Sequence, residues 1–89
     1  MPSREVDIVN RLGLHARAAA KLVATASEHE SRIEIEYNDQ RVNAKSIMGV
    51  MMLAAACGAR VTLHAEGEDA EQALARLAEL VEQRFGEPE

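Results

Sequence analysis

The sequence predicts an α+β fold in which helices cover one face of a four-stranded, mostly antiparallel sheet. Apolar and polar residues alternate, as in half-buried strands, in segments 32–37 and 60–65. Apolar residues recur at helical spacing in segments 16–27 and 70–81. Strands with one apolar face and helices with one apolar stripe pack in two layers, and the other sheet face stays solvated. We therefore expect an open-faced sandwich with the order β-α-β-β-α-β-α, as a single domain spanning residues 1–89.

The first half of the chain is expected to form a strand, a helix and a β-hairpin. Segment 6–9 contains β-branched residues and predicts a strand, and segment 16–27 predicts the first helix. In segment 32–37, isoleucine and tyrosine alternate with glutamate, which predicts a half-buried strand. The Asn-Asp pair at 38–39 favours a turn into a short return strand over 41–43.

A short second helix and a further strand are expected next. Ser46 is a favoured N-cap and predicts a helix start, and Gly58 fits a stop after Cys57. Segment 60–65 predicts a strand. Cys57 is the only cysteine, so we expect no intramolecular disulfide and a small buried thiol without a redox role.

The last helix is expected over segment 70–81. Asp69 is the predicted N-cap, and Gln72 stands three residues later as the partner of a capping box. Residues 86–89 are expected to form a frayed tail.

Composition excludes two classes of function. Tyr37 and Phe85 are the only aromatic residues in a chain that is 47% hydrophobic, so the core is expected to be aliphatic. Nucleic-acid binding uses aromatic stacking platforms or a basic surface, and this chain has a net charge of −5. That charge belongs to residues 46–89, which carry eight acidic and three basic side chains. No signal peptide or bilayer-length apolar run is recognisable, so we expect a cytoplasmic protein without membrane insertion.

The segment 13–17, Gly-Leu-His-Ala-Arg, places a histidine directly before the first predicted helix. A helix start offers free backbone N–H groups and a partial positive charge, which attract anions. We expect His15 to be a nucleophile that accepts and releases a phosphoryl group, and Arg17 to clamp phosphate oxygens. The backbone of Ala16, Arg17 and Ala18 would cradle that phosphate. Taken alone, the same pattern also fits an ordinary turn before a helix.

Ser46 begins a second helix and allows two interpretations. It is an N-cap and nothing more, or it is also a phosphorylation site. A phosphoserine at a helix start meets favourable amides, so it would disturb the fold little while adding about −1.5 to −2 charges to the surface. The spacing within the sequence leaves both interpretations open.

Together these two segments resemble the HPr family, the histidine-containing phosphocarriers of the bacterial phosphoenolpyruvate-dependent phosphotransferase system. Segment 13–17 resembles the active-site motif of the family, and Lys-Ser-Ile-Met-Gly at 45–49 resembles its regulatory serine motif. The separation of the two motifs, the element order and the chain length also match. The resemblance therefore covers almost the whole chain.

The resemblance implies a carrier rather than an enzyme. His15 would take a phosphoryl group on Nδ1 from phosphorylated enzyme I and pass it to an enzyme IIA-type domain, without a cofactor or a metal. Ser46 would be phosphorylated by an HPr kinase/phosphorylase in organisms that have one. A monomer is expected, because a carrier must offer one face to successive partners.

The resemblance also implies an apolar docking surface between the two motifs. Its candidate residues are Ala20, Ile47, Met48 and Met51, since adaptable methionine suits a surface that serves several partners. Core packing is the alternative for the methionines, and it is the role expected for Met52.

One residue departs from the family pattern. Ala18 stands where many members have proline, so we expect the stability of the helix start to change by some tenths of a kcal/mol, roughly, without loss of function. His29, expected in a solvated loop, and His64, expected on an outer strand face, lack companion ligands and are assigned no role.

Two other functions remain as alternatives. A regulatory binding module would act through Ser46 and make little use of His15. A structural adaptor would use only the methionine-rich surface. The sequence does not distinguish a sugar-transport branch from a nitrogen-related or purely regulatory one.

Overall fold

The predicted α+β architecture is confirmed by the computed structural model, which describes residues 2–89. Within this range four strands form: β1 (Ser3–Asp7), β2 (Arg32–Tyr37), β3 (Gln40–Asn43) and β4 (Arg60–Glu66). The same range contains three α-helices: α1 (Ala16–Ser27), α2 (Ile47–Met52) and α3 (Ala70–Glu82). A short 3-10 helix over Arg84–Gly86 follows α3.

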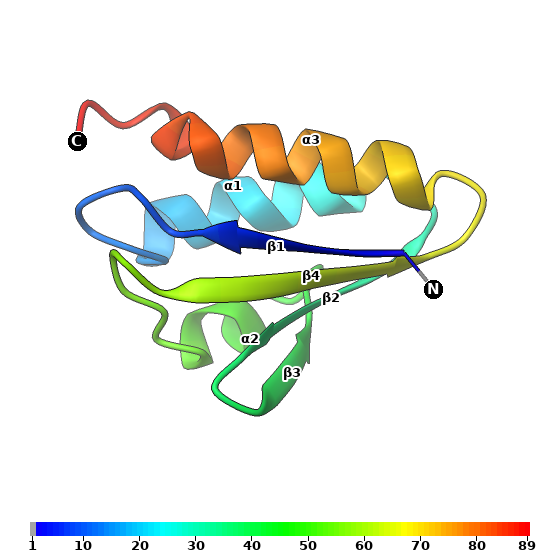
Figure 1. The fold of residues 1–89 in the computed structure, drawn as a ribbon, viewed down its shortest axis with the longest axis horizontal. Coiled ribbons are helices and arrows are strands. Elements are labelled where there is room, and N and C mark those ends of the chain that lie inside the picture. The colour runs from blue at the N-terminus through cyan, green and yellow to red at the C-terminus, as the bar shows by residue number, and fades with distance from the viewer. Residues whose placement is uncertain (1) are drawn as a thin grey trace.

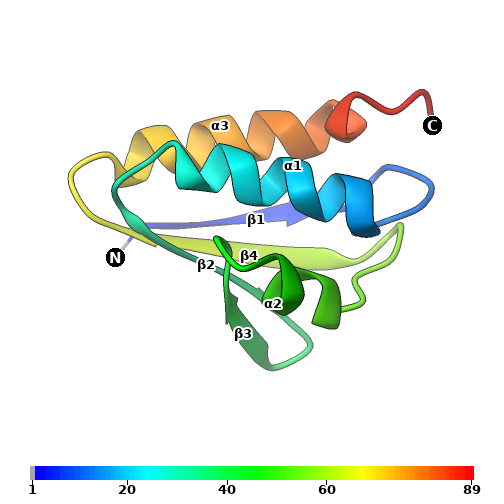
Figure 2. The same cartoon turned by 180° about the vertical axis from the view of Figure 1, so that it is seen from behind.

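The strands pair in the order β1-β4-β2-β3, and each neighbouring pair is antiparallel. The register places Ile35 of β2 opposite both Leu63 of β4 and Val42 of β3, so apolar side chains align on one sheet face. Helices α1 and α3 lie side by side over that face (Figures 1 and 2). Helix α2 packs against α1 and β3.

The core lies between the sheet and the helices and is aliphatic apart from one aromatic ring. Its largest fully buried apolar side chains are Phe85, Ile8, Leu22, Ile33, Ile35, Leu63, Leu77, Val50, Val61 and Val81. The opposite sheet face carries polar contacts instead, including the Arg41–Glu34 ion pair at 2.8 Å and a hydrogen bond between His64 and Glu36 at 2.8 Å. The two sheet faces therefore have the contrast that the alternation predicts.

The hairpin turn between β2 and β3 follows the prediction. Asn38 and Asp39 have φ of 55° and 66°, which is the left-handed pair of a two-residue hairpin turn. Asparagine and aspartate tolerate this conformation better than most residues, so the turn forms without glycine.

Three local predictions are wrong. Strand β1 covers residues 3–7 rather than 6–9, because Asp7 is the last residue that pairs with β4. Helix α2 ends at Met52, well before Gly58, because the chain reverses through Ala54 at φ 54°. The segment after α2 runs over the surface as a loop, so Cys57 is exposed rather than buried.

The start of α3 also differs from the expected capping box. Asp69 precedes α3, but its side chain makes no capping hydrogen bond. Its carboxylate accepts hydrogen bonds from the Ser31 hydroxyl and from the backbone N–H groups of Glu30 and Ser31, the latter two at 3.0 Å. Asp69 therefore ties the loop before β2 to the start of α3, and Gln72 has no capping partner there.

Candidate functional site

His15 is the N-cap of α1, as the sequence predicts. Its backbone is extended, with φ −74° and ψ −179°, and its Nδ1 accepts a hydrogen bond from the Arg17 N–H at 3.3 Å. The first turn of α1 contains no acidic residue, so its own side chains leave the partial positive charge uncompensated. The imidazole thus stands where a helix start can bind an anion.

The loop before His15 is held close to the loop after α2. Gly13 has φ 67°, and a Cβ there would lie 2.7 Å from the Ala55 carbonyl oxygen. The Leu14 N–H donates to that same oxygen at 2.9 Å, and the Leu14 side chain is buried. Glycine at position 13 is therefore required both by the backbone conformation and by the close approach.

The buried side chain of Asn10 stabilises the loop before His15. Its side chain is fully buried, and its Nδ2 donates to the Gly13 carbonyl at 2.8 Å. The same Nδ2 donates to Glu87 Oε1 at 3.1 Å. Asn10 thus connects the His15 loop to the chain segment that follows α3.

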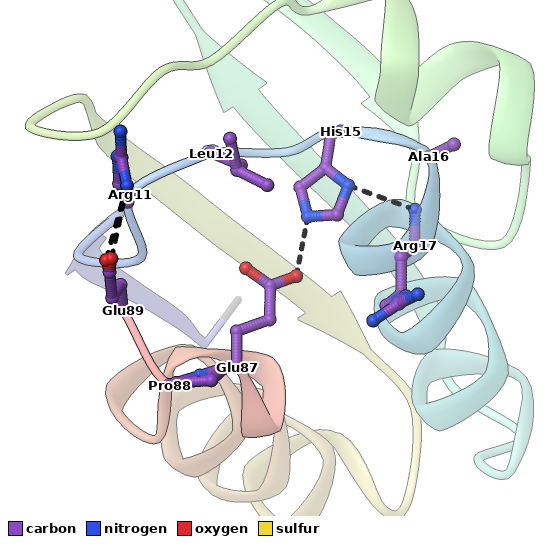
Figure 3. Close-up of a pocket in the computed structure, with 8 residues that line it drawn as sticks. All are labelled: Arg11, Leu12, His15, Ala16, Arg17, Glu87, Pro88 and Glu89. Carbon is purple, nitrogen blue, oxygen red and sulfur yellow. Dashed lines mark hydrogen bonds and ion pairs between the residues drawn. The ribbon is translucent and has the colours of Figure 1, made fainter.

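That segment is not the frayed tail expected from the sequence. Glu87 Oε2 lies 2.5 Å from His15 Nε2, and Glu89 pairs with Arg11 at 3.1 Å (Figure 3). Phe85 is fully buried, and Lys21 Nζ donates to its carbonyl at 2.6 Å. Residues 85–89 therefore pack against the start of α1.

Sequence reasoning missed Glu87 because short polar segments rich in Gly and Pro are usually unpaired. The one available signal was Phe85, an aromatic residue in a chain almost without them. A buried aromatic immediately before the tail fixes where the next residues begin and directs them toward the His15 loop.

Opposing effects set the ionisation of Glu87. Burial alone would raise its pKa, but hydrogen bonds from His15 and Asn10 and the positive charge of Arg17 outweigh burial. The net effect is a pKa below the usual range, so Glu87 is an anion near neutral pH. The site therefore contains a carboxylate as well as the arginine predicted from the sequence.

His15 borders an open pocket of about 730 Å³. Figure 3 shows the imidazole between the Glu87 carboxylate and the first turn of α1, with Leu12 and Arg11 on the loop that leads to His15. The lining residues are Arg11, Leu12, His15, Ala16, Arg17, Glu87, Pro88 and Glu89. Cations, carboxylates, an imidazole ring and apolar side chains thus meet at one exposed place.

The predicted cradle residues all lie in the first turn of α1. Ala16 and Arg17 are exposed, whereas Ala18 is fully buried. The Ala19 N–H donates to the His15 carbonyl at 2.8 Å, so the regular helix hydrogen bonds begin at that residue. The amides ahead of Ala19 are those in reach of an anion at His15.

Ser46 is the N-cap of α2. Its Oγ accepts a hydrogen bond from the Gly49 N–H at 3.2 Å, and the residue is half-buried. Ser46 is thereby confirmed as an N-cap, which both interpretations share. Phosphorylation of the same hydroxyl stays a prediction.

The residues predicted for docking are exposed, and α1 and α2, which carry them, are in contact. Their group is Ala20, Ile47, Met48 and Met51. Met52 was expected in the core but is 73% exposed, because Val50 and Leu53 fill the buried positions around it. Leu12, which sequence reasoning did not select, is 66% exposed beside His15.

The remaining candidates lie away from the pocket. His29 is half-buried, with Nδ1 3.0 Å from the Thr25 carbonyl, rather than in a solvated loop. His64 lies on the open sheet face, as predicted, beside Glu36. Among residues 2–89 no group of histidine, cysteine and carboxylate side chains is arranged to hold a metal ion. In the same range no helix is both long and apolar enough to cross a bilayer.

Comparison with known proteins decides the family. The family described as PTS HPr component phosphorylation site matches residues 2–83. The phosphocarrier protein HPr of Cupriavidus necator is 49% identical over 89 residues, which covers all of both chains. The chain belongs to the HPr family.

Solved structures agree with this membership. HPr-C-His from Thermoanaerobacter tengcongensis superposes on this HPr-family chain with a TM-score of 0.96 at 47% identity, covering all of both chains. A structure described as an HPr dimer from the same organism matches 98% of this chain and all of its own, with a TM-score of 0.79 at 48% identity. The predicted family and fold are both confirmed.

Proposed function

We propose that this HPr-family chain carries a phosphoryl group on His15, from phosphorylated enzyme I to an enzyme IIA-type domain. The observation that carries the proposal is the placement of His15 as N-cap of α1, with Nδ1 turned toward the helix start. A phosphoryl group on Nδ1 would meet the first-turn amides there. Membership of the HPr family supports the same role.

The chemistry needs no metal or cofactor in this proposal. The Nδ1 lone pair attacks phosphorus, a nitrogen–phosphorus bond forms, and the electron pair of the broken bond leaves with the donor. The Arg17 guanidinium, which is exposed beside the pocket, would follow the phosphoryl oxygens as they move. Transfer to the next partner reverses these steps.

Labelling tests the proposal directly. Incubation with enzyme I and phosphoenolpyruvate should give one acid-labile phosphate per chain, which is lost in His15→Ala. His64→Ala is the matched control, because His64 lies on the open sheet face and should leave labelling unchanged. Absence of labelling in the natural chain would sink the proposal.

Docking by the exposed apolar residues supports the relay. The exposed fractions of Leu12, Ile47 and Met48 are all at least 42%. Leu12 lies on the loop before α1, and Ile47 and Met48 lie at the start of α2, so this surface faces the partners in the proposal. In this proposal the chain acts in the cytoplasm as a monomer. Sedimentation at working concentrations tests the monomer against the dimeric state described for the related Thermoanaerobacter tengcongensis protein.

A second proposal concerns Ser46, whose neighbours Ile47 and Met48 belong to the exposed apolar residues. A phosphate on Ser46 would place about two negative charges among apolar side chains, which disfavours apolar docking. An HPr kinase/phosphorylase with ATP should label the natural chain but not Ser46→Ala. If labelled chain then binds partners differently while His15→Ala does not affect that binding, the regulatory alternative gains over the relay.

A further inference from the structure

We propose that Glu87 is a positioning residue for His15. Its carboxylate orients the imidazole through Nε2 and balances the positive charge of the ring while Nδ1 bonds to phosphorus. This inference rests on the proposed function of His15, but its geometry can be tested without any phosphoryl transfer.

Both oxygens of the Glu87 carboxylate are engaged. Oε2 lies 2.5 Å from His15 Nε2, and Oε1 accepts from Asn10 Nδ2 at 3.1 Å. Asn10 is fully buried and also bonds the Gly13 carbonyl, so it cannot swing away with the carboxylate. Only 10% of the Glu87 side chain is exposed. The carboxylate is therefore held in place before any partner binds.

The contacts on the two ring nitrogens of His15 agree on the tautomer. An ionised carboxylate can only accept, so Nε2 must carry the proton that Glu87 receives. Nδ1 accepts from the Arg17 N–H, so it must present its lone pair. Two independent partners thus assign the proton to Nε2 and leave Nδ1 as the nucleophile.

The chain on either side of Glu87 is anchored. Before it, Phe85 is fully buried, and Lys21 Nζ donates to its carbonyl at 2.6 Å. After it, the Arg11 N–H donates to the Glu89 carbonyl at 3.0 Å, and the two side chains form an ion pair. The Glu87 side chain is therefore delivered to His15 by a segment with its own fixed points.

The charge that develops during transfer needs such a partner. When the Nδ1 lone pair bonds to phosphorus, Nε2 keeps its proton and the ring becomes cationic. The Glu87 carboxylate compensates this charge from the side opposite the phosphoryl group. A carboxylate plays the equivalent part in a Ser-His-Asp triad, where it holds the imidazole tautomer and stabilises the imidazolium.

Kinetics and nuclear magnetic resonance together test the proposal. Glu87→Gln keeps the shape but removes the charge, and we expect single-turnover transfer from phosphorylated enzyme I to slow by about tenfold, well below the effect of a fully buried triad carboxylate. Glu87→Asp keeps the charge but shortens the side chain, and its transfer rate should lie between those of Glu87→Gln and the natural chain. Glu82→Gln is the matched control, since Glu82 is an exposed carboxylate at the end of α3, outside the pocket.

The nitrogen-15 resonances of the His15 ring supply the second readout, in the unphosphorylated chain. They should shift in Glu87→Gln and Glu87→Asp but stay unchanged in Glu82→Gln. Unchanged resonances together with natural transfer rates in both Glu87 variants would overturn the proposal. If the natural chain accepts no phosphoryl group at all, the proposed function fails, and the resonances alone decide whether Glu87 positions the ring.

Discussion

Helices α1 and α2 start with the same local device but in different surroundings. Each N-cap side chain accepts a hydrogen bond from a first-turn N–H, His15 at 3.3 Å and Ser46 at 3.2 Å. At α1 the cap has a second nitrogen, which Glu87 engages, and an arginine two residues later. At α2 the cap is followed by exposed apolar side chains.

This difference shows that capping geometry alone does not define a function. A serine cap uses its hydroxyl on the helix and has no second polar atom to be oriented. A histidine cap has two nitrogens, so one can face the helix while the other is set by a distant part of the chain. The chemistry proposed for His15 therefore depends on contacts that the α2 start does not have.

The largest expected effect comes from removing Arg17, which has no counterpart at the start of α2. Arg17→Ala is expected to slow phosphoryl transfer by about 100-fold, as loss of one preorganised donor does at other sites. Single-turnover transfer from phosphorylated enzyme I measures it. Arg76→Ala, at an exposed ion pair on α3, is the control and should leave the transfer rate unchanged. Equal transfer rates in Arg17→Ala and the natural chain would exclude a role for Arg17 in transfer.

A negative charge at the start of α2 should slow the transfer proposed for the start of α1. Ser46→Asp places an anion beside Ile47 and Met48, and we expect transfer from enzyme I to fall by about tenfold through weaker docking. The loss should appear in the concentration dependence of the rate and leave its saturated value intact. A fall in the saturated rate would show instead that the charge reaches His15.

Ser46→Ala tests the cap itself. Loss of the hydrogen bond to the Gly49 N–H should lower the free energy of unfolding by about 1 kcal/mol, the usual effect of losing a serine cap. Urea unfolding measures it, while His15 labelling should continue at the natural rate. A loss of labelling would mean that the α2 start holds the α1 site in place.

Helix α3 extends the comparison, because Asp69 stands at its start without capping it. The Ser31 hydroxyl lowers the pKa of Asp69 most, burial opposes it, and the N–H groups of Glu30 and Ser31 lower it further. A lowered folded-state pKa stabilises the fold above the unfolded-state pKa, and that stability is lost as pH falls through the folded-state pKa.

We therefore expect Asp69→Asn to lower the free energy of unfolding at neutral pH. In acid, where Asp69 of the natural chain is also uncharged, the free energies of the two chains should become more similar. Urea midpoints measured from neutral to acidic pH test this. A stability difference that stays constant with pH would exclude the carboxylate as its source.

The sequence predicted the elements with strong periodicity and the residues next to helix starts. Segments 32–37 and 60–65 alternate because each faces a core and a solvent side, and their strands appear where expected. His15 and Ser46 could be placed because a cap is a local feature. Local patterns were sufficient wherever the structure is local.

The failures share a physical cause, which is partnership between residues far apart in the chain. Asp69 bonds the loop before β2, some 38 residues away, instead of its own helix. Glu87 meets His15 across 72 residues. Helix α2 ends at Met52, and the loop after its turn at Ala54 packs closely on Gly13, a contact that no periodicity in that segment records.

The exposed position of Cys57 has a practical consequence. It is the single thiol of the chain, it lies on the loop after α2, and it is outside the residues that border the His15 pocket. A fluorophore or spin label attached there needs no background cysteine removed. Such a probe could report on partner approach in real time, from a loop that leaves the His15 ring untouched.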